Sequence, residues 1–150
     1  MDSNPSLERI NHFIDREEAR KLITAYREMQ PKLLNPQFER LQKEFGVLPT
    51  SEAFNEKSIL AILAQDGCVG IRIHYGLKQQ DVKGETIPLI VAVLVGVASD
   101  GSNMWARSAV TEASRVALKM AVTSRGSEED GVIVEDSQRC PPFGDSSPLP

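Results

Sequence analysis

The segment 87–98, Ile-Pro-Leu-Ile-Val-Ala-Val-Leu-Val-Gly-Val-Ala, most constrains the fold because it is apolar at both odd and even positions. It is rich in β-branched residues, which favour strands. It is also far shorter than the roughly 20 residues that a membrane-spanning helix needs. We therefore predict a central strand that is covered on both faces, with Pro88 at its start, where a missing amide does least harm.

The chain before this strand follows helical spacing. Asp15 and Glu18 form a capping-box pair, which places a helix start at Asp15. Pro31 disfavours helical geometry in the preceding residue, so the helix is expected to end near Met29. One apolar stripe is expected along it, formed by Ala19, Leu22, Ile23 and Tyr26.

Two further helices are predicted, over 37–45 and 56–64. Gly46 is placed to end the first in a left-handed conformation, and Asp66-Gly67 ends the second.

Beyond Gly67 the period changes from helical to alternating. In 68–75 one parity holds Val69, Ile71, Ile73 and Tyr75, and the other holds Cys68, Gly70, Arg72 and His74. This alternation predicts a half-buried strand with an apolar inner face. The polar, glycine-containing stretch 76–85 is expected to connect it to the next strand as a hairpin.

After the central strand, 99–103 reads as a turn, 105–123 as a helix and 131–135 as a third strand. The fold class is therefore α+β, with N-terminal helices packed on a small antiparallel sheet of two to four strands. The expected organisation is an N-terminal arm over 1–14, a single domain over 15–136 and a proline-rich tail over 137–150. Because the central strand is apolar on both faces in so short a chain, a homodimer is a secondary expectation.

Charge and targeting signals disfavour several classes of function. The net charge is −4 and no lysine- or arginine-rich run appears, so we expect no nucleic-acid partner. The N-terminus lacks the basic and apolar regions of a secretory signal, and no segment is long enough to span a bilayer, so a cytoplasmic protein without a membrane partner is expected. Two cysteines are too few for a disulfide scaffold.

The candidate site residues are Arg72, His74 and Cys140. Arg72 and His74 emerge about 7 Å apart on one strand face and could bind a carboxylate or phosphate, or simply form the solvated side of the sheet. Cys68 and His74 are six residues apart on that strand, roughly 20 Å, which excludes a nucleophile–base pair. A pair between His74 and Cys140 stays open.

No metal or cofactor is expected. The four zinc-type ligands of the chain (Cys68, Cys140, His12 and His74) are scattered, without a local Cys-x-x-Cys or His-x-x-His pair. The sequence also lacks the spacing of a P-loop or of a dinucleotide-binding Gly-x-Gly-x-x-Gly motif.

Three parts of the chain form a recognisable pattern: 58–75 with Gly-Cys-Val-Gly-Ile-Arg, the Val-Gly-Val strand that leads into Asp100-Gly101, and the terminal Cys-Pro-Pro-Phe of 140–143. This pattern resembles a family of small, uncharacterised bacterial proteins of the Bacteroidetes type. The family has no established activity, so the resemblance implies no catalytic residues.

The functional hypothesis is a non-enzymatic binding or protein-interaction module that uses the face with Arg72 and His74. The alternatives are a small thiol-dependent enzyme that uses Cys140 or Cys68 with His74, and a structural subunit of an assembly.

Overall fold

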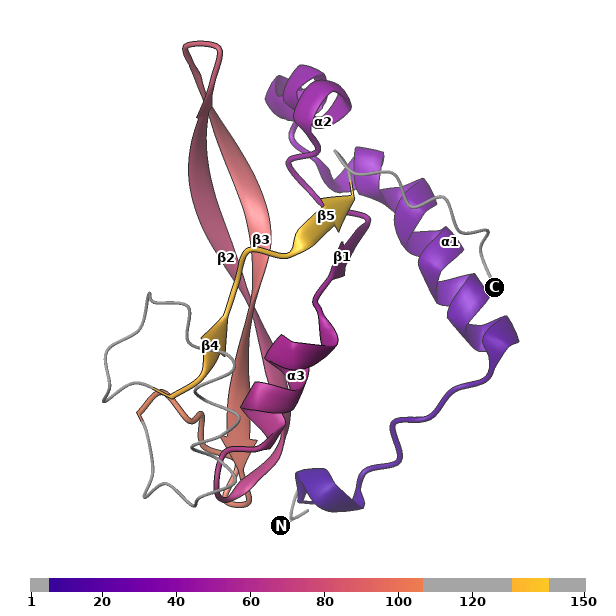
Figure 1. Cartoon of the computed structure of the whole chain (residues 1–150). Helices are drawn as coiled ribbons and strands as arrows, with labels where there is room; N and C mark the ends of the chain where they lie inside the picture. The colour runs from indigo at the N-terminus through magenta and orange to yellow at the C-terminus, as the bar shows by residue number, and fades with distance from the viewer. Residues whose placement is uncertain (1–5, 107–130, 141–150) are drawn as a thin grey trace. The chain divides into compact units, whose positions relative to one another are not determined.

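The computed structural model of the chain describes residues 6–106 and 131–140 (Figure 1). These residues form three α-helices and two antiparallel sheets of two and three strands, which confirms the predicted α+β class. Contacts divide the chain into two compact units. The described residues of the first unit are 6–11, 54–75, 92–106 and 131–136, and those of the second are 12–53, 76–91 and 137–140.

Helix α1 (Arg16–Leu33) begins where the sequence predicts, because the Asp15 carboxylate accepts a hydrogen bond from the Glu18 amide at 2.8 Å. The predicted end near Met29 is wrong, and the helix continues through Pro31. Gln30 explains the difference. Its side chain is buried and donates to the carbonyls of Leu48 and Pro49, so tertiary contacts hold the residue before the proline in helical geometry.

The other helices are short. A 3₁₀ turn η2 (Pro36–Phe38) leads into α2 (Glu39–Phe45), which ends at Gly46 with a φ of 66°, as predicted. Helix α3 (Glu56–Leu63) begins at an Asn55 cap. Within the predicted arm, a 3₁₀ turn η1 (Leu7–Arg9) places Leu7 so close to Gly70 that a β-carbon there would lie 2.7 Å from it.

The three-stranded sheet has the order β2 (Cys68–Val82), β3 (Glu85–Ala98) and β4 (Ile133–Val134), so the predicted central strand is confirmed. The expected long connection over 76–85 is wrong. Strand β2 extends to Val82, and only Lys83 and Gly84 form the turn, with φ values of 51° and 79°. Two positive φ angles produce the tight turn that matches the twist of paired strands.

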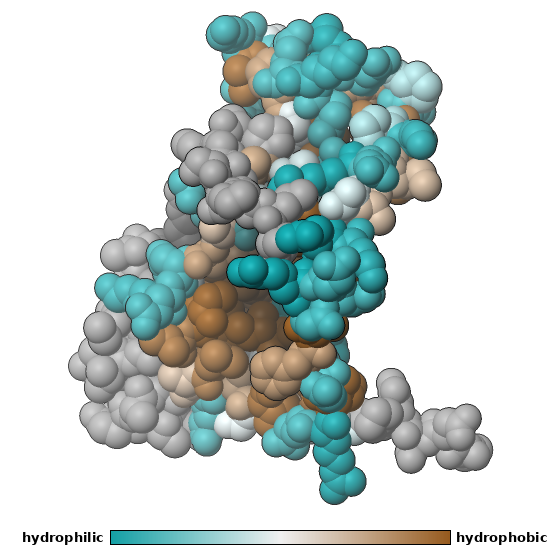
Figure 2. All heavy atoms as spheres, turned by 90° about the vertical axis from the view of Figure 1, so that its right-hand side faces the viewer, coloured by the Kyte–Doolittle hydropathy of each residue, from teal (hydrophilic) through white to brown (hydrophobic). Residues whose placement is uncertain are grey.

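The core of the first unit forms where α3 packs against β3. It is built from Ala61, Ile62, Ala92, Leu94 and Val132. The Gln65 side chain joins the segments around this core, since it donates to the Ile62 carbonyl at 3.0 Å and accepts from the Val132 amide at 2.8 Å. Figure 2 shows apolar atoms gathered in the lower half of the face that it draws. Leu60 and Leu63 of α3 are exposed.

The core of the second unit joins α2 to the beginning of β3. Ile87, Leu89 and Val91 are buried there, with Leu41 and Phe45 of α2 packed against them. Two strands that the sequence did not predict, β1 (Ser51–Ala53) and β5 (Gln138–Cys140), pair antiparallel. The start of the expected tail is therefore a strand.

The predicted burial of β2 is partly wrong. Ile71 packs against the core of the first unit, but Ile73 and Tyr75 are 52% and 77% exposed. The predicted helix over 105–123 lies outside the described residues from 107 onward, and residues 105 and 106 are not helical. No helix in the described part of the chain is long and apolar enough to cross a membrane.

Candidate functional site

The candidate site lies in the first unit, where the end of β3 folds back beside β2. Beyond Ala98 the chain turns. The Gly101 amide donates to the Ala98 carbonyl at 2.9 Å, and the Ala98 amide donates to the Ser102 carbonyl at 3.0 Å. The Met104 amide then donates to the Gly96 carbonyl at 2.9 Å, so 102–104 run antiparallel to the end of β3. This return places Asn103 and Trp105 close to residues of β2.

Asp100 stabilises the turn that makes this return. Its carboxylate accepts from the hydroxyl of Ser102 at 2.6 Å and from the Ser102 amide at 2.9 Å. These two hydrogen bonds hold the pKa of the Asp100 carboxyl below its ordinary value, the hydroxyl having the larger effect. Gly101 completes the turn with a φ of 84°, which a residue with a side chain rarely adopts.

Arg72 is bound to the same turn. Its Nη1 donates to the Gly101 carbonyl at 3.1 Å and to Asn103 Oδ1 at 2.5 Å, while the side chain stays exposed. Within the part of the chain that the structure describes, Arg72 donates hydrogen bonds only through Nη1. The guanidinium is therefore held in one orientation, with Nε and Nη2 left for other contacts.

His74 follows Arg72 on the same strand face and stacks on Trp105. The ring centroids are 5.2 Å apart and the planes are tilted by 37°. His74 Nε2 is buried and makes no hydrogen bond to any described residue, whereas Trp105 is 46% exposed. A buried polar atom without a hydrogen-bond partner is costly, and a ligand would reach this nitrogen only if the groups that cover it moved.

We call the set formed by Arg72, His74, Asn103 and Trp105 the Trp105 cluster. It combines a fixed cation with a partly exposed aromatic ring, and both groups can contribute to binding. Cys68 does not belong to it. This thiol packs against the core of the first unit and its Sγ lies 3.2 Å from the Gly70 carbonyl, which is how a structural free cysteine behaves.

Cys140, the third residue predicted for the site, belongs to the second unit, whereas Arg72 and His74 belong to the first. It lies at the end of β5, where its carbonyl accepts from the amide and the hydroxyl of Thr50 at 2.8 and 3.1 Å. Its backbone thus fixes the pairing of β1 and β5, and its thiol is half-buried.

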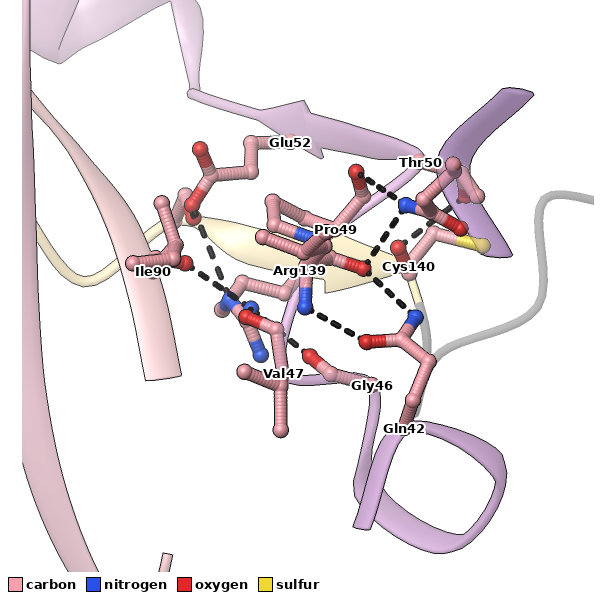
Figure 3. A network of polar contacts seen from close by, with 12 residues as sticks. Gln42, Gly46, Val47, Pro49, Thr50, Glu52, Ile90, Arg139 and Cys140 are labelled. Carbon is pink, nitrogen blue, oxygen red and sulfur yellow. Dashed lines mark hydrogen bonds and ion pairs between the residues drawn. The ribbon is translucent and has the colours of Figure 1, made fainter. Parts of the chain in front are cut away.

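The neighbouring Arg139 lies in a network of polar contacts in the second unit (Figure 3). Its Nη2 donates to the carbonyls of Ile90, Gly46 and Val47 at 2.8, 3.0 and 3.3 Å. Its Nε lies 3.8 Å from the Glu52 carboxylate, and both side chains are at most 10% exposed. Because Nη2 bonds to three backbone carbonyls and Nε faces the Glu52 carboxylate, we interpret Arg139 as a residue that stabilises the fold.

Sequence reasoning missed Asn103 and Trp105 as site residues. The available signal was that the single tryptophan of the chain comes directly after the turn 99–103. In the described residues, His, Cys, Asp and Glu side chains do not gather in any group of three that could hold a metal ion.

Comparisons of the chain with models of protein families, with curated proteins and with solved structures found no match. The family resemblance suggested by the sequence therefore stays a prediction.

Proposed function

We propose that the protein is a non-enzymatic interaction module that binds an anionic group of its partner, a carboxylate or a phosphate, at the Trp105 cluster. The observation that carries this proposal is that Trp105 stays 46% exposed while it stacks on His74, beside an exposed Arg72 that two hydrogen bonds hold in place.

The chemistry of these side chains fits recognition of an anion. A guanidinium binds carboxylates and phosphates through paired N–H donors, and an orientation fixed in advance reduces the entropy lost on binding. Trp and Arg are enriched among the residues that contribute most to binding at protein interfaces. His74 contributes through the contact of its ring with Trp105.

Because Trp105 is the single tryptophan, its fluorescence reports on the cluster without interference. We would titrate the full chain at low ionic strength with inorganic phosphate and with a glutamate-rich peptide, and use a lysine-rich peptide as the control ligand. The expected result is a saturable change with an anionic probe and no change with the lysine-rich peptide.

Two matched variants separate specific binding from general attraction. Arg72→Gln should weaken binding at least about tenfold, since a hydrogen bond to a charged group contributes about 1.5–3 kcal/mol. Arg16→Gln, an equal charge change at an exposed position of α1, should leave the affinity unchanged. Equal affinities for the wild type and Arg72→Gln, or no saturable signal with either anionic probe, would contradict the proposal.

A further inference from the structure

Helix α1 (Figure 1) carries a row of exposed apolar side chains. Leu22, Tyr26, Met29 and Leu33 are 55%, 40%, 48% and 71% exposed. With the half-buried Ala19 they are spaced by three, four, three and four residues. This is the heptad spacing by which two helices pack side by side. We call these five residues the α1 seam.

The contacts of α1 with its own unit leave the seam open, because they use a neighbouring flank of the helix. Gln30 is buried and bonds to the carbonyls of Leu48 and Pro49, and Ile23 is half-buried on the same flank. The seam residue Tyr26 also bonds to its own unit, through its hydroxyl and the Pro49 carbonyl at 2.9 Å. This hydrogen bond fixes the Tyr26 ring, so the exposed edge of the ring is already ordered for contact with a partner helix.

The charges beside the seam identify the partner. On the other flank lie three exposed residues spaced by seven, Glu18, Ala25 and Lys32. If two copies of α1 pack antiparallel with Ala25 at the two-fold axis, Glu18 of each copy lies opposite Lys32 of the other. The same register packs Leu22 of one copy against Tyr26 of the other. Because the apolar row and the charges complement themselves in one register, the fitting partner is a second copy of this chain.

We propose that the α1 seam is the interface of an antiparallel homodimer of this chain. The seam lies entirely in the second unit and the Trp105 cluster in the first, so this inference does not rest on the proposed function. A helix pair of this length with exposed ion pairs gives a reversible dimer, whose affinity falls as salt screens the two ion pairs.

The test is sedimentation equilibrium of the full chain over a range of concentrations. The wild type should dimerise, and Met29→Glu should abolish the dimer by placing a charge in the seam. Glu18→Lys and Lys32→Glu should each weaken dimerisation about tenfold, because each turns two opposite-charge pairs into like-charge pairs. The double variant Glu18→Lys/Lys32→Glu should restore the wild-type affinity, since each pair again joins one lysine and one glutamate, with their positions exchanged.

Lys21→Glu is the matched control, because it changes the net charge as Lys32→Glu does at an exposed position outside the seam. It should dimerise like the wild type. Circular dichroism shows whether each variant keeps its helix content. A wild type that is monomeric at every concentration, a well-folded Met29→Glu that still dimerises, or a double variant that stays as weak as the single ones would overturn the proposal.

Discussion

Replacement of Arg139 tests whether one buried guanidinium holds the second unit together. In the variant Arg139→Met, the carbonyls of Gly46 and Ile90 lose a donor, and Glu52 loses the cation 3.8 Å from its carboxylate. The Val47 carbonyl keeps a partner, because it also accepts from the Ile90 amide at 2.9 Å. Methionine fills a similar volume, so the loss is mainly electrostatic.

The magnitude follows from these groups. An unsatisfied buried polar group costs about 1–3 kcal/mol, and breaking a buried ion pair on one side costs about 3–5 kcal/mol. The side chains of Arg139 and Glu52 are up to 10% exposed, so water that enters the site can hydrogen-bond the unpaired groups and offset part of this cost. We expect Arg139→Met to lower the free energy of unfolding by about 3–5 kcal/mol. Arg139→Lys keeps the charge but lacks the planar guanidinium that can bond to several carbonyls at once. It should lower the free energy of unfolding by about 1–2 kcal/mol.

Urea unfolding followed by circular dichroism measures these changes, and amide exchange at Thr50 localises them to the second unit, where this amide donates to the Cys140 carbonyl. Glu52→Gln supplies the second arm of a double-mutant cycle. Because Arg139→Met leaves a buried charge that Glu52→Gln removes, the double variant should cost at least about 1 kcal/mol less than the sum of the single ones. A loss below about 1 kcal/mol for Arg139→Met would refute this reasoning.

Three further predictions concern single positions. Gly96→Ala should lower the free energy of unfolding by about 1–3 kcal/mol in a urea titration, because a β-carbon there would lie 2.9 Å from the side-chain Nε2 of Gln65 in a packed core. Lys83→Asn should raise it by about 0.5–1 kcal/mol, since asparagine tolerates the positive φ of this turn better than lysine. In an NMR titration, Ser102→Ala should raise the pKa of Asp100 toward its ordinary value. The stability that these bonds give the turn is present above the ordinary pKa of the unfolded carboxyl and is lost as the pH falls through the lower folded value.

Local signals in the sequence predicted those elements whose causes are themselves local. The cap at Asp15 and the stop at Gly46 depend on residues within a single turn, and both are present in the structure. The central strand β3 was predictable because residues of both parities are apolar, and residues of both parities are buried.

Elements that depend on distant partners were not predictable in the same way. Strands β1 and β5 have three residues each, too few for a period, and they form because segments far apart in the sequence pair with each other. Helix α1 passes through Pro31 because Gln30 is held by carbonyls 18 and 19 residues away. The prediction that one face of β2 is buried was partly wrong for a related reason. The core of the first unit packs against Ile71, whereas Ile73 remains exposed.

The same distinction bears on function. Of the residues that the sequence suggested as reactive, the Cys68 thiol contacts the Gly70 carbonyl, whereas His74 Nε2 makes no hydrogen bond to a described residue. The side chains that stay exposed, Trp105 beside Arg72 and the apolar row of α1, are those that contribute contact area and orientation at interfaces. Catalysis needs a nucleophile or base directed at a substrate, whereas recognition needs exposed, fixed surface. The proposal of an interaction module rests on the exposed and fixed groups of the Trp105 cluster.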